Sequence, residues 1–515
     1  MDSRKNYVVA VDVGSSEVVI AVGSMAEGGT VNIETVVAEP LTGVSAGLVE
    51  NSQTVAEALR RARVRAEQEV GVAITDAYVT ISGRFVRCAR YTDHVFVEDN
   101  ENRISQRDLA ALRERMLNVK AGAGEVIMDL FPLCYKSDIG TELQNPVGCY
   151  SKQLSSTYNF ILCEDTAKDR LRRVFLDVGI KIRSMFAGAS VMAKSLVTSD
   201  EKEDGVAIVD IGSGVTDLAI YRGGVLCYIA SIPMGGSALN NDILGYDNNI
   251  PSRMVENLKK QCGSAVVELT PDDMIQVRNR GRAIKPIPRL NLAAVIEARM
   301  TDIAEYVWNE IREAGYAKKL GAGIVLTGGG ANLKNVGELF HRITEQEVRV
   351  ACAEIGVATE ALEKYASPSY TMALSLLLHG AEVGPCPVGV LIQRPAEPKT
   401  EPKTEPVKPV EPAQPAKPAQ PKVTPQPQVT PQPQVTPQPQ VTPQPQPQPQ
   451  PIQQPAEPNT LKGEDDNYGD DIADGDDDVK PGRGGWFRGW GGKIKRAFTE
   501  AFPEPGEDVD GDDEY

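Results

Sequence analysis

Two segments of this chain carry the same pattern, and this repeat constrains the fold more than any other feature. The first, YVVAVDVGSSEVVIAVG, begins at Tyr7, and the second, GVAIVDIGSGVTDLAIYRGG, begins at Gly205. Each reads as a strand, a tight turn and a second strand, with an Asp at the end of the first strand. These residues, Asp12 and Asp210, lie 198 positions apart. We therefore expect each copy to open one half of an α/β molecule.

The turn that follows each Asp suits a phosphate group. Glycine permits positive φ and lets backbone N–H groups approach an anion closely, while a serine hydroxyl adds a donor. The carboxylates would repel a phosphate unless a hydrated divalent cation lay between them, so Asp12 and Asp210 predict Mg²⁺. One such hairpin would be an ordinary turn, whereas two copies with matching flanks favour a functional site. The phosphate-binding candidates are Gly14 and Ser15 in the first turn and Gly212 and Ser213 in the second.

A third glycine-rich segment, GIVLTGGGANLKNVGELF, predicts a strand, a glycine triplet and a helix. The strand runs from Ile324 to Thr327, and the helix is expected to begin near Asn332. Bare backbone and a helix N-terminus would offer a surface to the sugar and α-phosphate of a nucleotide. The triplet lacks the G-x-G-x-x-G spacing of dinucleotide sites, and no G-x-x-x-x-G-K-[ST] loop occurs in the chain. The triplet consists of Gly328, Gly329 and Gly330.

Proline divides the chain into two parts of different composition. Of its 36 prolines, 11 fall in the first 394 residues and 25 in the last 121. Four VTPQPQ repeats begin at Val423, Val429, Val435 and Val441, and they contain nothing large and apolar enough to form a core. We expect residues 385–482 to be a disordered linker that acts as a semi-rigid, polyproline-like spacer. A ligand for an SH3-type domain is the less favoured interpretation.

Charge, apolar runs and cysteines exclude several classes of protein. The net charge of −17 divides into −10 from Ala396 onward and −7 before it, so neither part has the basic field that nucleic-acid binding requires. The longest apolar runs are strand-length and no signal peptide precedes the first strand, so we expect a cytosolic chain. The eight cysteines form no CxxC pair and are expected to be free thiols.

The segment GGWFRGWGGKIKRAFTEAF near the end separates aromatic and cationic faces on a helical wheel, as interfacial helices do. Five cations between Arg483 and Arg496, with no acid among them, would be drawn to anionic lipid at about 1 kcal/mol each. We expect residues 483–502 to form a membrane-targeting helix and 503–515 an acidic tail. Docking on the protein's own body, a partner motif, and pairing with the acidic run Glu464 to Asp478 stay open. The membrane-binding candidates are Trp486, Phe487, Arg488, Trp490, Lys493, Ile494, Lys495, Arg496, Phe498 and Phe502.

The two hairpins and the glycine triplet, in this order and at these distances, resemble the actin-like ATPase superfamily. Within it, several further stretches resemble the FtsA family of bacterial cell-division proteins over about residues 5 to 384. The resemblance implies an α/β actin-like ATPase fold with two lobes and an insert subdomain. The stretches are NPVGCYSKQL from Asn145, IPMGGSALNNDIL from Ile232, VIEARMTDI from Val295, LTGGGANLKNV and YTMALSLLLHG.

The resemblance also implies subdomain boundaries. By this resemblance, an insert called 1C, of the SHS2-like kind, takes the place of subdomain 1B of actin. Its predicted helix, from Gln106 to Leu117, lies between predicted strands, which is compatible with a small α+β unit. The implied ranges are 5–84 and 164–204 for subdomain 1A, 85–163 for 1C, 205–236 for 2A, 237–309 for 2B, and 310–384 for the return to 2A and 1A.

In that family the two lobes close on ATP, which implies further site residues in this chain. Glu256 and Lys259 would lie by the ribose and adenine, although without the resemblance a solvated ion pair on one helix is the preferred interpretation. Val215 departs from the small polar residue that many relatives have. The motifs contain no His or Glu to act as a general base, so no catalytic residue is predicted and at most slow ATP hydrolysis is expected. The further implied residues are Ser16, Gly214, Thr216, Gly235 and Gly236, with Asp12 and Asp210 holding Mg²⁺ through water.

The resemblance implies a protein that self-associates into filaments and tethers FtsZ, and with it the Z ring, to the cytoplasmic face of the membrane at the division site. Arg299 would face FtsZ, and the 1C insert would contact other copies and later division proteins. Two alternatives differ in kind. A small-molecule kinase on the same fold would consume ATP rapidly with an acceptor. A chaperone is disfavoured because the VTPQPQ spacer follows where a substrate-binding domain would lie.

Overall fold

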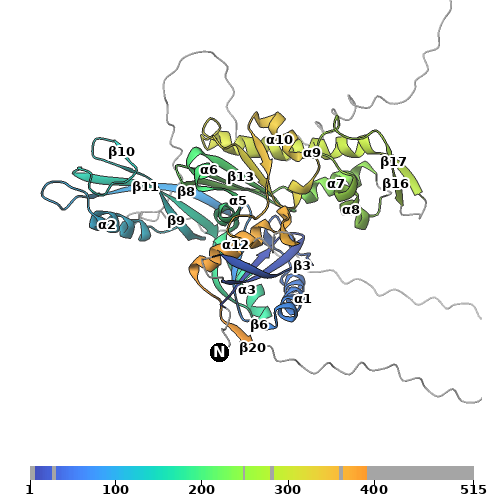
Figure 1. The fold of residues 1–515 in the computed structure, drawn as a ribbon, viewed down its shortest axis with the longest axis horizontal. Coiled ribbons are helices and arrows are strands. Elements are labelled where there is room, and N and C mark those ends of the chain that lie inside the picture. The colour runs from blue at the N-terminus through green and yellow to red at the C-terminus, as the bar shows by residue number, and fades with distance from the viewer. Residues whose placement is uncertain (1–5, 26–29, 248–249, 279–283, 359–363, 391–515) are drawn as a thin grey trace, which may run out of the picture. The chain divides into compact units, whose positions relative to one another are not determined.

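The strands of this chain assemble into two five-stranded sheets, one four-stranded sheet and three two-stranded ribbons (Figure 1). The computed structural model describes residues 6–25, 30–247, 250–278, 284–358 and 364–390. The predicted linker and the membrane-targeting helix lie outside these residues, apart from the first few positions of the linker range. Among the described residues, every helix is too short or too polar to span a lipid bilayer.

The first five-stranded sheet contains the first copy of the repeated hairpin. Its order is β12-β7-β1-β2-β3, in which β1, β2 and β3 form an antiparallel meander and β1, β7 and β12 run parallel. Val8 to Val11 and Val18 to Val22 are buried, as strands covered on both faces require. The strands are β1 (Tyr7–Val13), β2 (Glu17–Met25), β3 (Val31–Pro40), β7 (Asp76–Ile81) and β12 (Lys181–Ala187).

Helices cover this sheet. α1 begins where the Asn51 side chain accepts hydrogen bonds from two backbone N–H groups, and it ends at Gly71 in the left-handed region. α1 packs on β2, β3 and α3, whereas α12 packs on β1, β2 and β7. The helices of this lobe are α1 (Ser52–Val70), α3 (Asp165–Val178), α4 (Gly188–Val191), α5 (Ala193–Leu196), α6 (Ser199–Asp204) and α12 (Thr371–Val383). Two ribbons complete it, β4 (Val44–Ser45) with β5 (Leu48–Val49), and β6 (Val72–Ile74) with β20 (Val388–Val390).

The second five-stranded sheet repeats the plan of the first. Its order is β15-β14-β13-β18-β19, again an antiparallel meander followed by two parallel strands. Two lobes with one topology confirm the expectation drawn from the repeated hairpin. The strands are β13 (Val206–Ile211), β14 (Thr216–Arg222), β15 (Val225–Ile232), β18 (Ile324–Thr327) and β19 (Val348–Val350). With the sheet lie α7 (Gly236–Tyr246), α8 (Ser252–Cys262), the ribbon β16 (Met274–Arg278) and β17 (Ile284–Pro288), α9 (Arg289–Glu313) and α10 (Val336–Thr344).

One local prediction is wrong. The strand from Ile324 to Thr327 is confirmed, but the α-helix after the glycine triplet begins at Val336 rather than near Asn332. A 3-10 turn, η1 (Gly329–Asn332), intervenes, and Asn335 has φ 61°, which breaks continuous helical geometry. The triplet is therefore followed by a tight turn and not by the N-terminus of an α-helix. A second 3-10 turn, η2 (Pro368–Tyr370), precedes α12.

Between β7 and α3 the chain forms a small α+β unit with its own apolar core. Its antiparallel sheet has the order β10-β9-β11-β8, and α2 packs on β8 and β11. Leu112 and Met116 of α2 are buried with Leu154 and Phe160 of the sheet. The helix begins and ends at the predicted residues. The elements are β8 (Val86–Phe96), α2 (Gln106–Leu117), β9 (Glu125–Lys136), β10 (Glu142–Leu143) and β11 (Gln153–Glu164).

Candidate nucleotide-binding site

The two repeated turns have the same backbone geometry and touch one another. In the first, the Gly14 N–H donates to the Glu17 carbonyl at 3.0 Å, and in the second the Gly212 N–H donates to the Val215 carbonyl at 2.9 Å. A Cβ on Gly214 would collide with the Ser15 side chain. The structure therefore brings together two turns that lie 198 residues apart.

Ser15 has a buried hydroxyl without a hydrogen-bond partner among the described residues. A buried polar atom in this state costs free energy unless a ligand or water satisfies it. Because the hydroxyl lies between the two glycine turns, the oxygen of a phosphate bound there would accept a hydrogen bond from it. Neighbouring Ser16 is exposed, and its carbonyl accepts from the Leu41 N–H at 2.8 Å.

The second turn rests on the start of α7. The Gly236 N–H donates to the Gly212 carbonyl at 2.9 Å, and the Ser213 carbonyl accepts from the Ser237 N–H at 2.8 Å. A Cβ on Gly235 would lie 2.5 Å from the Gly212 carbonyl oxygen, so only glycine allows this approach. The predicted Gly235 and Gly236 thus shape the second turn directly.

Thr216 follows the second turn directly, at the start of β14, and is fully buried. Its hydroxyl donates to the Met234 carbonyl at 2.8 Å and so ties β14 to the segment that follows β15. In this arrangement Thr216 holds the turn in shape, and a direct contact with phosphate stays a prediction.

The glycine triplet contacts the end of β13. Gly328 has φ 84°, and a Cβ there would collide with the Asp210 carboxylate, while one on Gly330 would collide with Ile211. Gly329 differs, because it is exposed and the nearest atom to a Cβ would be the Ser369 hydroxyl at 3.7 Å. Packing alone requires glycine at two positions of the triplet, and Gly329 presents the bare backbone.

Three carboxyl groups gather where β1, β13 and β14 meet the turns. Asp12 accepts from the Thr80 hydroxyl at 2.5 Å, and burial raises the pKa of Asp12 to about 6. Burial, and then the charges of Asp217 and Asp12, raise the pKa of Asp210 well above its ordinary value. Burial also raises the pKa of Asp217 to about 6, although hydrogen bonds from Ser231 and Ser82 oppose the rise. A divalent cation nearby would favour the ionised forms of all three groups.

Asp217 is the site residue that sequence reasoning missed. It is 4% exposed and lies directly opposite Asp210 in the β13–β14 ladder. The corresponding partner of Asp12 in the first hairpin is Val19, so a comparison of the two copies hides it. Counting residues across the second hairpin would have revealed Asp217.

Glu256 and Lys259 lie on α8 beside the Gly235–Gly236 segment. The Lys259 ammonium is 2.8 Å from the Glu256 carboxylate and donates to the Gly236 carbonyl at 3.0 Å. Burial lowers the pKa of Lys259. Burial alone would raise the pKa of Glu256, but hydrogen bonds from Lys259 and Asn240 outweigh it and lower that pKa. The structure thus brings this pair to the other predicted site residues.

Arg299, predicted to face a partner, is only 8% exposed on α9. Its guanidinium forms two hydrogen bonds to Asp242 of α7, at 2.6 and 3.1 Å, and one to Asp302 at 3.0 Å. The arrangement braces α7 against α9. A role of Arg299 in partner binding stays a prediction, and it would be exerted through this brace.

Comparison with known proteins agrees with the residue patterns. The model of the family "Cell division protein FtsA" matches residues 207–375. The FtsA of Escherichia coli K12 is 29% identical over 388 residues, which cover 73% of this chain and 91% of that protein. The FtsA of Buchnera aphidicola is 28% identical over 359 residues, covering 68% and 84%. This chain is similar to FtsA.

The FtsA relationship spans both lobes and the insert between them. Among solved structures, the PilM–PilN type IV pilus biogenesis complex superposes with a TM-score of 0.50 at 13% identity, over 72% of this chain and 98% of that one. A likeness at this identity concerns the fold alone. The fold is the mixed α/β, actin-like fold that the sequence predicted, and kinship with FtsA supports a role in cell division.

Proposed function

We propose that this chain is a cell-division protein that binds ATP with Mg²⁺ and links FtsZ to the membrane. The observation that carries the nucleotide assignment is the meeting of two matching glycine turns around the Ser15 hydroxyl, which has no partner among the described residues. Backbone N–H groups and hydroxyls in such turns bind phosphate. The similarity to FtsA supports the rest of the proposal, in which the chain links FtsZ to the membrane.

The residues around the turns divide the work of binding. Gly14, Ser15 and Ser16 would hold one side of the phosphates. Asp12 and Asp210 would hold Mg²⁺ through water, and the cation would neutralise phosphate charge beside the three carboxylates. Glu256 and Lys259 would lie by the ribose and adenine, near Gly329 of the triplet. The second turn, with Gly212, Ser213, Gly214, Thr216, Gly235 and Gly236, would hold the opposite side of the phosphates.

The nucleotide acts as a conformational ligand in this proposal. A ligand shifts a two-state equilibrium by its difference in affinity for the two states, and fast turnover is not needed. The nucleotide-bound state would self-associate into filaments and bind FtsZ, and the unit between β7 and α3 would contact later division proteins. Residues 483–502 would place the assembly on anionic lipid at the cytoplasmic face of the membrane.

Nucleotide binding is tested with a fluorescent ATP analogue, mant-ATP, in the presence of Mg²⁺. Ser15→Ala is expected to weaken binding by about tenfold, because one hydrogen bond to a charged phosphate is lost. Ser24→Ala is the matched control, since Ser24 is also a buried lobe-one serine but donates to Glu34. Equal affinities for the parent and Ser15→Ala would remove this serine from the site. Rapid, acceptor-dependent ATP consumption by the parent would favour a small-molecule kinase instead.

The adaptor role is tested by co-sedimentation with anionic liposomes, with and without FtsZ. The full chain is expected to pellet with the liposomes and to bring FtsZ with it. A chain that ends at Gly482 is expected to remain in the supernatant while it still binds mant-ATP. Lipid binding by the shortened chain would contradict the anchor, and liposomes that carry the full chain but no FtsZ would contradict the adaptor role.

A further inference from the structure

The strand β15 has a special place, because it lies between the candidate nucleotide site and the unit formed by β8 to β11. At its carboxyl end, the Ser231 hydroxyl donates to the carboxylate of Asp217. That carboxylate is close enough to Asp12 and Asp210 to raise the pKa of both. Asp217 lies opposite Asp210 in the β13–β14 ladder and opposite Ser231 in the β14–β15 ladder, so a change at the two turns reaches β15 through the paired strands and this side-chain hydrogen bond.

The middle of β15 is bonded to the inserted unit. The amide of Asn159 on β11 donates to the Cys227 carbonyl at 3.3 Å, and the Cys88 thiol on β8 donates to the Ile229 carbonyl at 3.5 Å. Asn159 is fully buried, and its side-chain oxygen has no partner among the described residues. Among the described residues, the bond to Cys227 is therefore the one hydrogen bond that the Asn159 side chain forms. A shift of β15 would displace the Asn159 side chain and with it β11.

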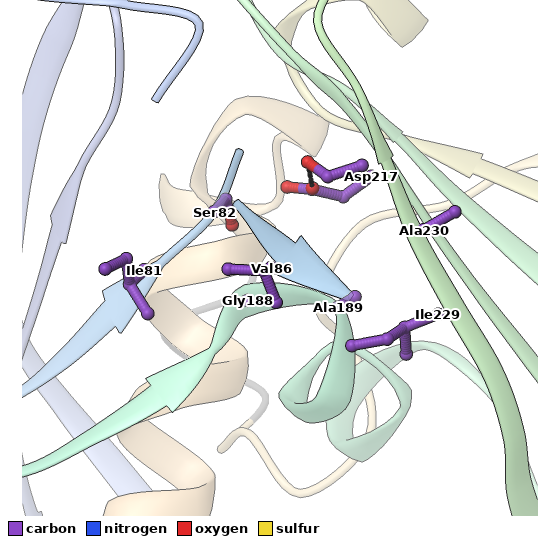
Figure 2. Close-up of a pocket in the computed structure, with 9 residues that line it drawn as sticks. Ile81, Ser82, Val86, Gly188, Ala189, Asp217, Ile229 and Ala230 are labelled. Carbon is purple, nitrogen blue, oxygen red and sulfur yellow. Dashed lines mark hydrogen bonds between the residues drawn. The ribbon is translucent and has the colours of Figure 1, made fainter. Parts of the chain in front are cut away.

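The first lobe contacts the same junction. Figure 2 shows Ser82, which follows β7, and Asp217, both of which line a small pocket at this junction. The pocket walls include Gly188, Ala189 and Ala230. The pocket also contains Ser231 of β15, so residues of the first lobe lie beside the Asp217–Ser231 hydrogen bond.

We propose that β15 transmits occupancy of the nucleotide site to the inserted unit, by way of Asp217, Ser231 and the two bonds to β8 and β11. The inference rests on the proposed nucleotide binding. When Mg²⁺ and phosphate arrive beside Asp12 and Asp210, Asp217 shifts in the ladder between Asp210 and Ser231, and β15 carries the change. Self-association or partner binding by the inserted unit then depends on the nucleotide through a defined physical route.

The test is hydrogen–deuterium exchange of the full chain with and without Mg²⁺ and mant-ATP. In the parent, amides of β8 and β11 are expected to change their exchange rate by about threefold or more on binding. Ser231→Ala is expected to retain mant-ATP affinity within about threefold, because Ser231 lies outside the two turns. It is expected to reduce the response in β8 and β11, because the side-chain bond to Asp217 is lost. Ser24→Ala, which removes a serine–carboxylate bond elsewhere, is expected to keep both.

The outcomes separate the two proposals. A parent that fails to bind mant-ATP overturns the proposed function and this inference with it. A parent that binds without any change in β8 and β11 overturns the inference alone, as does a Ser231→Ala protein that keeps the full response. If Ser231→Ala does not unfold cooperatively, and so is not properly folded, Asn159→Ser is tested in its place. This substitution removes the hydrogen bond between β11 and β15 at the other end of the route. Asn159→Ser is expected to bind normally with a reduced response in β11, and an unchanged response overturns the inference.

Discussion

The carboxyl group of Asp217 is the clearest example of a residue whose environment sets its chemistry. It is almost fully buried, faces Asp210 across a β-ladder and accepts a hydrogen bond from Ser231. Burial raises the pKa of this carboxyl to about 6, so it becomes charged only as the pH rises through that value. Above that pH the buried charge lowers the stability of the fold, and a bound cation would offset this cost.

Asp217→Asn is expected to make stability less dependent on pH. The folded-state pKa of about 6 lies above the ordinary value of 3.8, so the stability due to this group is present below pH 4 and is lost as pH rises through 6. Without Mg²⁺, the variant should match the parent at pH 4 and exceed it by up to about 3 kcal/mol at pH 8. Urea unfolding at several pH values measures the difference.

Asp93→Asn is the control of opposite sign for this experiment. Burial would raise the pKa of Asp93, but hydrogen bonds from Arg115, at 2.7 and 3.0 Å, and from the His94 N–H outweigh it and lower that pKa. The variant is expected to lose stability at neutral pH and little at low pH. A pH-independent difference between the parent and Asp217→Asn would show that the pKa of Asp217 is the same in the folded and the unfolded protein.

Arg299 supports a second prediction at this scale. Arg299→Ala leaves Asp242 without its bidentate partner and is expected to destabilise the protein by about 2 to 4 kcal/mol. If Arg299 serves FtsZ binding by bracing α7 against α9, Asp242→Asn should weaken FtsZ co-sedimentation to a similar degree. Loss of FtsZ binding in Arg299→Ala but not in Asp242→Asn would instead indicate a direct contact by the guanidinium.

At the scale of elements, the two hairpins depend on one close approach. Gly214→Ala is expected to abolish mant-ATP binding, since its Cβ would collide with Ser15 and force the two turns apart. Gly245→Ala in α7 is the matched control, because a Cβ there meets nothing within 4 Å, and it should bind normally. Equal binding by both variants would show that the turns tolerate separation.

Elements were more predictable than contacts. The paired hairpins, β18 and α2 follow from local patterns of apolar residues and glycine, so the sequence predicted the two-lobed fold. The start of α10 did not follow, because the left-handed backbone of Asn335 is imposed by packing and has no distinct local signal. Asp217 and the buried state of Arg299 depend on partners 7 and 57 residues away, at Asp210 and Asp242, which no local pattern predicts.

At the scale of the whole molecule, the proposed function combines a nucleotide-binding body and a lipid anchor in one chain. Lys493→Gln combined with Lys495→Gln is expected to lower partition onto anionic liposomes by about 10- to 30-fold, at about 1 kcal/mol for each cation. Raising the salt concentration should also weaken the binding of the parent protein to liposomes, because salt screens the charge of the lipid.

Lys462→Gln combined with Lys480→Gln is the control for this prediction. It removes the same charge from the chain outside the predicted helix, at positions in the linker range. It should leave liposome binding nearly unchanged. An equal loss in both double variants would mean that net charge, and not the amphipathic segment, governs adsorption.

The pairing of β20 with β6 has a mechanical consequence. The last described strand is only Val388–Val390, but the backbone before it is secured by the Tyr78 hydroxyl, which donates to the Gly384 carbonyl, and by the Cys386 N–H, which donates to the Tyr7 carbonyl. A pull on the chain beyond this point would first strain the short ribbon and then load the sheet that contains Asp12. Tension from a membrane tether would enter through the first lobe, so the lobe that receives the force also holds half of the nucleotide site.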